Sequence, residues 1–164
     1  MVETLDEYLA LAKGIAEEAP AEVDLRALAE DVVSDSQRTG ADVTIEADGA
    51  VLIPGRMRAL KRCMLNLIDN AIAHGDKVQV AVKGEADAVT VTVDDNGPGI
   101  PEDLYEEAFR PFSRLDETRS RNQKGVGLGL AIARDVARSH GGDIKLSKSP
   151  LGGLRASLRL PRPA

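Results

Sequence analysis

The sequence predicts a two-layer α/β sandwich, in which about three helices cover one face of a mixed, largely antiparallel β-sheet. The first observation is periodicity. Some segments have apolar residues three and four positions apart, as in helices. Between them lie pairs of segments in which apolar and polar residues alternate, as in strands. The second is composition, because 43% of the residues are hydrophobic but only 2% are aromatic, so the core must be aliphatic. A chain of 164 residues suits one domain with a sizeable core.

The first half of the chain contains three predicted helices and one predicted hairpin. Apolar spacing predicts a helix over residues 1–18, which Pro20 ends, and Asp24 is a good N-cap for a second helix. The apolar stripe of this second helix is Leu25, Leu28, Ala29, Val32 and Val33. The stretch VTIEADGAVLIP, residues 43–54, is interpreted as a hairpin around its Asp-Gly pair. A long helix is expected from about Arg56 to His74.

The second half contains two predicted hairpins, a long polar segment and one helix. The stretches KVQVAVKG and AVTVTVDD, within residues 77–95, alternate with period two and form a hairpin. Residues 101–124 are polar and rich in Arg, and a loop of this length in a compact domain is usually functional. A helix is expected from about Leu128 to Ser139, ending at a Gly-Gly pair. The stretches DIKLSKS and LRASLRLP, within residues 143–161, form the last hairpin.

Charge and cysteine content exclude several classes of function. The formal net charge of −6 argues against a nucleic-acid surface. No apolar run approaches the length of a membrane span, and the N-terminus lacks the order of a signal peptide. The single cysteine, Cys63, cannot form an internal disulfide, so a reducing cytoplasm is the simplest home, and it is expected to be a buried small hydrophobe. The two histidines have no metal-ligand spacing, so zinc chemistry is not expected.

One helix carries polar residues at a regular spacing. In CMLNLIDNAIAH, Asn66, Asn70 and His74 are four positions apart and share one helical face. Asparagine is a weak helix former and gains nothing from burial without partners. Taken alone, the stretch leaves two interpretations open, a solvated surface stripe and a ligand site. An Asn oxygen suits Mg²⁺, an ion that keeps most of its waters and shares phosphate oxygens.

Two further stretches bend the backbone beside polar groups or glycines. VTVDDNGPGI, residues 91–100, begins as a strand and then delivers Asp94 and Asp95 into turn-forming residues. KGVGLGLAI, residues 124–132, places three alternating glycines directly before an apolar helix, where backbone N–H groups and the helix dipole can meet a phosphate. This run lacks the Lys-Ser/Thr of a P-loop and the context of a dinucleotide fold. A phosphate site here would belong to another architecture.

The chain contains, in this order, a helix with regularly spaced asparagines, a Gly-Pro-Gly turn after an aspartate and a second glycine run. Together they resemble the ATP-binding domain of sensor histidine kinases, within the superfamily that includes DNA gyrase, Hsp90 and MutL. The resemblance covers roughly residues 23–161. It rests on five motifs, NLIDNAIAH as the N box, DDNGPGIP and GVGLGLAIA as the two glycine boxes, AFRPFSRLD as the phenylalanine box, and LGGLRASLRLP as the closing strand pair. The phenylalanine box points to the kinases, and the likeness is greatest to osmosensor-type kinases of the EnvZ kind.

The resemblance implies ATP and Mg²⁺ as cofactors and assigns residues to them. Asp95 would accept a hydrogen bond from the adenine amino group, whereas Asp94 is expected to be a solvent-exposed residue at the strand end. Asn70 would hold the metal, and Phe109 and Phe112 would anchor the root of an ATP lid. The implied catalytic residues are Asn66 and Arg114. The implied nucleotide-binding residues are Asn66, Asn70, His74, Asp95, Gly97, Gly99, Ile100, Arg114, Leu115, Gly125, Val126, Gly127, Leu128, Gly129 and Leu130.

Some positions separate this chain from its relatives. Gyrase-type hydrolases have a water-activating glutamate where this chain has Asn66, so poor ATP hydrolysis is expected. His74 stands where the kinases usually have tyrosine, and Ala73 replaces a Lys or Arg. Arg155 falls where many relatives have Thr near the adenine. Each of these three differences can weaken nucleotide binding.

The resemblance also implies a domain organisation and partners. Residues 1–19 resemble the tail of a dimerisation and phosphotransfer helix, and residues 20–164 the catalytic domain, with the lid at about 101–126. The acceptor motif, similar to His-Glu-Leu-Arg-Thr-Pro, is absent, so this chain alone is not expected to autophosphorylate. The expected partners are a histidine-bearing dimerisation domain and a response regulator, with no nucleic acid and no direct membrane contact. The expected location is the cytoplasmic side of an inner-membrane sensor. The alternatives are a nucleotide-binding regulatory module and a gyrase- or Hsp90-type hydrolase.

Overall fold

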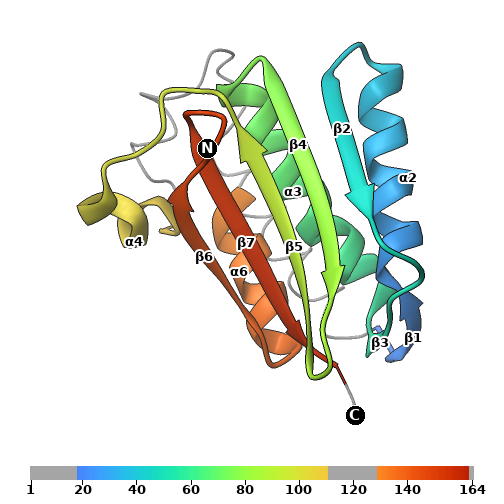
Figure 1. The fold of residues 1–164 in the computed structure, drawn as a ribbon. Coiled ribbons are helices and arrows are strands. Elements are labelled where there is room, and N and C mark those ends of the chain that lie inside the picture. Colours follow the sequence, from blue (N-terminus) through green and yellow to red (C-terminus); the bar gives the residue numbers. More distant parts are fainter. Residues whose placement is uncertain (1–17, 111–128, 163–164) are drawn as a thin grey trace, which may run out of the picture.

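A computed structural model describes residues 18–110 and 129–162, and its centre is a five-stranded sheet (Figure 1). The strand order is β2-β4-β5-β7-β6. The first pair, β2 with β4, is parallel, and each of the other three neighbouring pairs is antiparallel. The strands are β2 (Asp42–Ala47), β4 (Lys77–Gly84), β5 (Ala88–Asp95), β6 (Asp143–Lys148) and β7 (Leu154–Pro161). The predicted mixed, largely antiparallel sheet is therefore confirmed.

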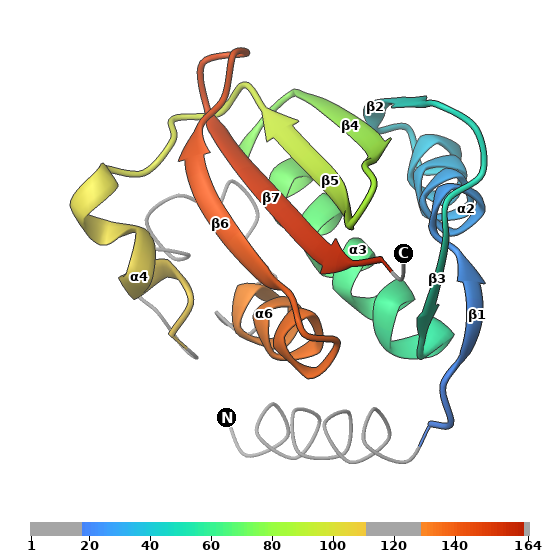
Figure 2. The same cartoon turned by 60° about the horizontal axis from the view of Figure 1, so that its bottom comes forward.

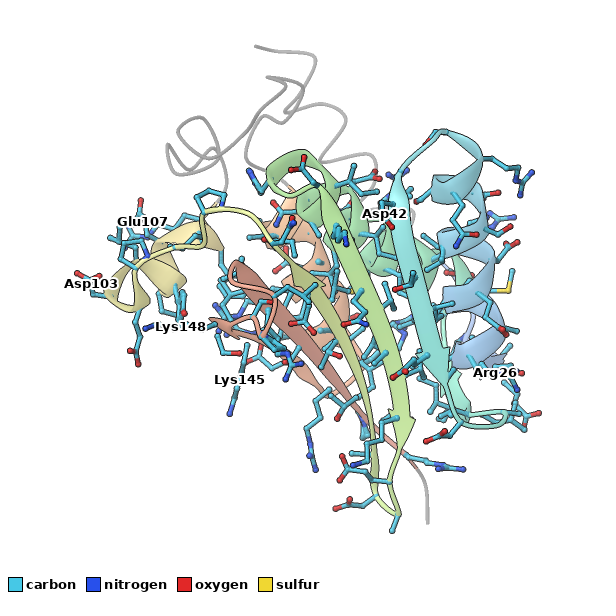
Figure 3. The ribbon with its side chains drawn as sticks, turned by 45° about the horizontal axis from the view of Figure 1, so that its top comes forward. Arg26, Asp42, Asp103, Glu107, Lys145 and Lys148 are labelled. Atoms are coloured by element: carbon cyan, nitrogen blue, oxygen red, sulfur yellow. The ribbon has the colours of Figure 1, made fainter. Side chains whose placement is uncertain are left out.

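Three helices cover one face of this sheet (Figure 2). They are α2 (Leu25–Arg38), α3 (Met57–His74) and α6 (Gly129–Ser139); α2 begins directly after its predicted N-cap, and α3 and α6 lie within one residue of their predicted bounds. Helix α2 begins where expected, because the Asp24 side chain accepts hydrogen bonds from the N–H groups of Arg26 and Ala27. The other face of the sheet is polar. Asp42 and Lys145 are exposed on the two edge strands, β2 and β6 (Figure 3).

The hairpin predicted over residues 43–54 is wrong. Its first half, β2, joins the main sheet beside β4, while its second half, β3 (Leu52–Gly55), pairs antiparallel with β1 (Ala21–Asp24). The backbone N–H of Leu25 donates to the carbonyl of Val51 at 2.8 Å, which ties this small ribbon to the start of α2. Residue alternation indicates that a segment is a strand, but it does not identify the partner strand.

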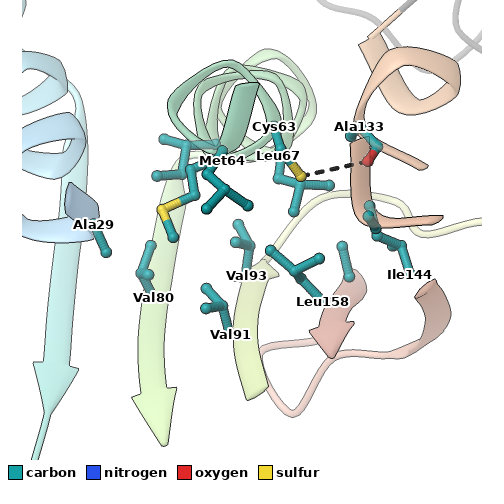
Figure 4. Packing of buried hydrophobic residues seen from close by; sticks show 14 of the residues in the cluster. Ala29, Cys63, Met64, Leu67, Val80, Val91, Val93, Ala133, Ile144 and Leu158 are labelled. Carbon is teal, nitrogen blue, oxygen red and sulfur yellow. Dashed lines mark hydrogen bonds between the residues drawn. The ribbon is translucent and has the colours of Figure 1, made fainter. Parts of the chain in front are cut away.

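The core lies between the sheet and the helices and is aliphatic, as predicted. Figure 4 shows Met64 and Leu67 of α3 facing Val80, Val91 and Leu158 of the sheet. Cys63 belongs to this core and is fully buried. Its thiol donates to the carbonyl oxygen of Ala133 in α6 at 3.4 Å, and burial raises the pKa of the thiol to about 12. Cys63 is thus a packing residue joining α3 to α6.

The predicted loop begins with helical turns instead of irregular chain. A 3₁₀ turn, η1 (Glu102–Leu104), leads into a single α-helical turn, α4 (Tyr105–Ala108). Residues 111–128, and the predicted helix over 1–17, lie outside the described residues. Within the ranges 18–110 and 129–162, no helix is long and apolar enough to cross a bilayer.

Candidate nucleotide-binding site

Helix α3 carries the polar face that the sequence identified. The Nε2 atom of His74 lies 3.2 Å from Oδ1 of Asn70, a donor-to-acceptor pair when the His74 proton is on Nε2. His74 is only 1% exposed. One turn before Asn70, the Nδ2 atom of Asn66 is buried and has no hydrogen-bond acceptor among the described residues. The solvated-stripe interpretation is therefore wrong, because two of the three polar side chains place polar atoms away from water.

The unsatisfied Asn66 amide group adjoins the start of α6. A Cβ built on Gly129, the first residue of α6, would come within 4.0 Å of Asn66 Cβ, so the two helices nearly touch there. Burying an amide donor without a partner costs about 1–3 kcal/mol. An anionic oxygen bound beside Asn66 would remove this cost, and the N-terminus of α6 favours negative charge at the same place.

Asp95 lies at the end of β5, and its carboxylate is held by backbone groups. Its Oδ1 atom accepts hydrogen bonds from the N–H of Gly97 at 2.9 Å and from the N–H of Leu154 at 3.2 Å. Its own carbonyl accepts from the N–H of Gly153 at 3.1 Å. Asp95 is 1% exposed. An ionised carboxylate can accept about four hydrogen bonds at once, so backbone donors and a ligand N–H can share one carboxylate.

Glycines let three chain segments meet around Asp95. A Cβ on Gly97 would collide with the carbonyl oxygen of His74 at the end of α3, and one on Gly153 would collide with Oδ1 of Asp95. Gly99 adopts a φ of 72°, a left-handed conformation that favours glycine. The Gly-Pro-Gly stretch therefore bends the chain immediately after Asp95 and packs it against α3. Gly153 and Leu154 were missed in the sequence, where the Gly-Gly pair before β7 was the available signal.

The structure places Asp94 and Arg155 in contact with each other, which the sequence did not predict. Asp94 is 4% exposed, so it is not a solvent residue. Arg155 donates two hydrogen bonds to the Asp94 carboxylate, from Nε to Oδ1 at 2.8 Å and from Nη2 to Oδ2 at 2.9 Å. These bonds raise the pKa of the Arg155 guanidinium above its ordinary value. The two residues face each other across β5 and β7 on the side of the sheet opposite Asp95. Arg155 is thus directed to Asp94, on the face of the sheet opposite Asp95, and its effect on nucleotide binding stays a prediction.

Arg134 of α6 connects α4, which precedes the undescribed residues 111–128, to strand β6. Its guanidinium lies 4.1 Å from the ring centroid of Phe109, which is buried, and its Nη1 lies 2.9 Å from Glu106 in α4. Its Nε lies 3.0 Å from Oδ1 of Asp143 in β6. Phe109 thus packs into the core beside Arg134, and its role at the root of a lid stays a prediction. Arg134 was not singled out in the sequence, because no local pattern distinguishes it from other surface arginines.

The remaining predicted residues divide into two groups. Ile100 and Leu130 are 8% and 2% exposed and belong to the core, and their contact with a nucleotide stays a prediction. The others lie outside the described residues, namely Phe112, Arg114, Leu115, Gly125, Val126, Gly127 and Leu128.

Comparisons with known proteins agree on one family. The model of the histidine kinase-, DNA gyrase B- and HSP90-like ATPases matches residues 55–164. The sensor histidine kinase GtrS of Pseudomonas aeruginosa is 46% identical over 124 residues, which are 74% of this chain and 25% of GtrS. The sensor histidine kinase CpxA of Escherichia coli is 38% identical over 129 residues, 77% of this chain and 28% of CpxA. The chain thus spans about a quarter of the length of these curated relatives.

Solved structures are similar over most of this chain. The ATP-binding domain of PrrB from Mycobacterium tuberculosis has a TM-score of 0.75 and 32% identity, covering 88% of this chain and 98% of that one. The histidine kinase domain of the E. coli osmosensor EnvZ has a TM-score of 0.69 and 29% identity, covering 90% of this chain and 92% of that one.

Proposed function

This chain belongs to the family of histidine kinase-, DNA gyrase B- and HSP90-like ATPases, and we propose that it is the catalytic domain of a two-component sensor histidine kinase. In this proposal it binds Mg-ATP and delivers the γ-phosphate to a histidine on a dimerisation domain. The proposal rests on two features of one site. The carboxylate of Asp95 is buried and held by backbone N–H groups, and the amide nitrogen of Asn66 is buried without a hydrogen-bond acceptor among the described residues. Asp95 ends β5, and the turn after it packs through Gly97 against the carbonyl of His74, at the end of the helix that carries Asn66.

The described residues fit both ends of ATP, the adenine and the phosphates. Asp95 would accept a hydrogen bond from the 6-amino group of adenine, whereas guanine has a carbonyl oxygen at that position, which a carboxylate would repel. Asn66 comes eight residues before His74 on α3, about 12 Å along the helix axis. Its amide N–H would donate to a phosphate oxygen there. This assignment uses a buried amide donor that has no acceptor among the described residues.

Asn70 would hold Mg²⁺ through Oδ1, with the hydrogen bond from His74 fixing the orientation of its side chain. The ion would neutralise charge on the phosphate oxygens. The residues of this chain supply positioning and charge stabilisation, because position 66 has an amide and no carboxylate that could take a proton from water. ATP is therefore kept intact until an acceptor arrives.

Neither histidine of this chain is suited to be the phosphate acceptor. His74 is buried against Asn70. The ring of His140 joins two elements, since its Nε2 accepts from the N–H of Arg56 at 3.0 Å and its Nδ1 lies 2.8 Å from the carbonyl of Val136. We infer that the acceptor lies on a separate dimerisation domain, that residues 1–19 are the tail of that domain, and that residues 101–126 form the ATP lid.

The proposed partners follow from this division of labour. The dimerisation domain would pass its phosphate to a response regulator, and this domain would act on the cytoplasmic side of a sensor protein in the inner membrane. Support comes from the names of the relatives, which are sensor histidine kinases.

The test is phosphate transfer from γ-labelled Mg-ATP to a separately made dimerisation domain of the parent kinase. Label should appear on the added domain in acid-labile form, and not on this chain alone. Replacing the acceptor histidine by glutamine should abolish it. Asn70→Ala should remove at least about 90% of the Mg²⁺-dependent transfer, whereas Gln79→Ala, an exposed amide on β4, should not. ATP binding without transfer would indicate a regulatory module, and rapid ATP turnover by this chain alone a hydrolase.

A further inference from the structure

We propose that Arg155, through its ion pair with Asp94, positions the Asp95 carboxylate for recognition of the adenine amino group. Arg155 would then be a positioning residue for nucleotide specificity, although it lies on the opposite face of the sheet. This inference rests on the proposed function, because it concerns the selectivity of the same ATP site.

The first step is the place of the ion pair in the sheet. Asp94 and Arg155 form the last pair of the ladder between β5 and β7 at this end of the two strands. The ends of strands separate most easily, because they have ladder neighbours on one side only. A two-bond contact between carboxylate and guanidinium closes this end in a fixed geometry, which a single hydrogen bond would not do.

The second step is what lies immediately beyond that pair. The next residue on β5 is Asp95, and the two residues before Arg155 are Leu154 and Gly153. Their N–H groups donate to Oδ1 and to the carbonyl oxygen of Asp95. The main chain of β7 therefore supplies one of the hydrogen bonds that orient Oδ1, and Gly97 supplies another. Any shift of β7 along or away from β5 moves these donors and turns the carboxylate.

The third step concerns how strongly the ion pair holds the two strand ends together. The side chain of Asp94 is 5% exposed and that of Arg155 36%, so the contact is largely shielded from water. Loss of Arg155 would leave a buried carboxylate without its partner, which favours separation of the strand end so that Asp94 regains water. The first structural consequence is displacement of Leu154 relative to Asp95. Lysine at position 155 would restore charge but not the planar two-bond geometry.

The experiment compares the affinity of this chain for ATP with its affinity for purine riboside triphosphate, which lacks the 6-amino group. A hydrogen bond to a charged group contributes a factor of roughly 10–100 in affinity, so the wild-type protein should prefer ATP by about that factor. Arg155→Met should reduce the preference to about threefold or less by weakening ATP binding alone. Arg155→Lys should be intermediate.

The matched control is Arg159→Met. Arg159 lies four residues further along β7 on the same face, and its Nη2 is 3.9 Å from Asp87, so both arginines have a carboxylate neighbour but only Arg155 has a buried one. This variant should keep the wild-type preference. If Arg155→Met does not fold, the double variant Asp94→Asn with Arg155→Met removes both charges and leaves no buried unpaired carboxylate. It should also lose the preference.

Each result decides between outcomes. Equal loss of affinity for both nucleotides in the Arg155 variants would mean that Arg155 only stabilises the fold, and an unchanged preference would mean that it has no role in the site. Either overturns the inference and leaves the proposed function intact. Failure of the wild-type protein to bind ATP, or to prefer it, would instead contradict the proposed function.

Discussion

Asn66 illustrates how a binding residue can oppose stability. Its Nδ2 atom is buried with no acceptor among the described residues, in a helix whose neighbouring positions, Cys63 and Leu67, belong to the core. A donor in this state destabilises the unliganded protein, because it has lost its hydrogen bonds to water and gained none. In the proposed function, position 66 therefore holds a residue that satisfies a ligand rather than the fold.

Asn66→Leu tests this interpretation through two effects of opposite sign. Leucine has a similar volume and no polar atoms, so we expect the free energy of unfolding without nucleotide to rise by about 1 kcal/mol. Affinity for ATP should fall at least about tenfold, since the phosphate loses a donor. Urea unfolding and calorimetric titration measure the two quantities. A variant that is both less stable and unchanged in ATP binding would contradict the assignment.

Helix α3 depends on a cap that its own sequence does not supply. The residue at its N-cap position, Arg56, makes no side-chain capping hydrogen bond. Glu18 takes this role from a distance in sequence, as its Oε2 accepts from the N–H of Arg58 at 2.9 Å and its Oε1 from the N–H of Ala59 at 3.1 Å. The Nε of Arg56 in turn donates to the Glu18 carbonyl at 2.8 Å. The chain leading into the domain is thus fixed to the helix that carries Asn66.

We expect Glu18→Ala to lower the free energy of unfolding by about 1 kcal/mol, the usual effect of removing a cap, with part of it due to the helix dipole. Glu22→Ala is the matched control, since Glu22 is an exposed glutamate on β1 and should change stability by less than about 0.5 kcal/mol. Urea unfolding of both variants at neutral pH makes the comparison. Equal effects would show that the two hydrogen bonds at α3 contribute nothing specific.

The contact between α4, α6 and β6 depends on ionised carboxylates around Arg134. A hydrogen bond from Arg134 holds the pKa of Glu106 below its usual value. Burial acts to raise the pKa of Asp143, but hydrogen bonds from Arg134, the Ile144 N–H and Arg138 together hold it below its ordinary value. Because both pKa values are lower in the folded protein, the stabilisation is complete above about pH 4 and is lost as the pH falls through the lowered values.

Arg134→Met should therefore destabilise the protein more at pH 7 than at a pH below the lowered pKa values, where both carboxylates are largely protonated in the folded and in the unfolded state. The pH-dependent part should be within about 1 kcal/mol per pair, because Glu106 is 81% exposed. Urea unfolding of wild type and variant across this range gives the difference directly. Arg138→Met, which removes a single and more exposed contact to Asp143, should show a weaker pH dependence. A difference that does not change with pH would assign the role of Arg134 to its packing on Phe109 alone.

At the scale of the whole molecule, the sequence predicted elements better than their arrangement. The start of α2 and both bounds of α3 and α6 were predicted within one residue, because the apolar stripes of these helices face the sheet. The failed hairpin over residues 43–54 has a different cause. Its two strands alternate correctly, but the choice between pairing with each other and pairing with β4 and β1 depends on segments distant in sequence. Periodicity contains no information about that choice.

The same limit applies to the site. Asn70 and His74 were associated correctly, because a helix fixes residues four apart on one face. The donors to Asp95 from Leu154 and Gly153 come from a strand about sixty residues later, and the burial of Asp94 depends on Arg155 of that same strand. Such contacts exist only once β7 lies beside β5. Predicting them from sequence requires the sheet order, which local patterns did not establish.

The sheet, the helices and the site form one core, so ligand binding should stabilise the whole domain. A ligand that binds only the folded state, present at 100 times its Kd, raises the free energy of unfolding by about 2.7 kcal/mol. Asp95→Asn retains an oxygen for the N–H groups of Gly97 and Leu154, but it places an amide N–H₂ where the adenine amino group also donates. We expect this variant to fold and to gain less than about 0.5 kcal/mol from the same Mg-ATP concentration. Asp42→Asn, on the exposed edge strand β2, should retain the full gain. Thermal or urea unfolding with and without nucleotide decides the matter, and an undiminished gain in Asp95→Asn would remove Asp95 from the adenine site.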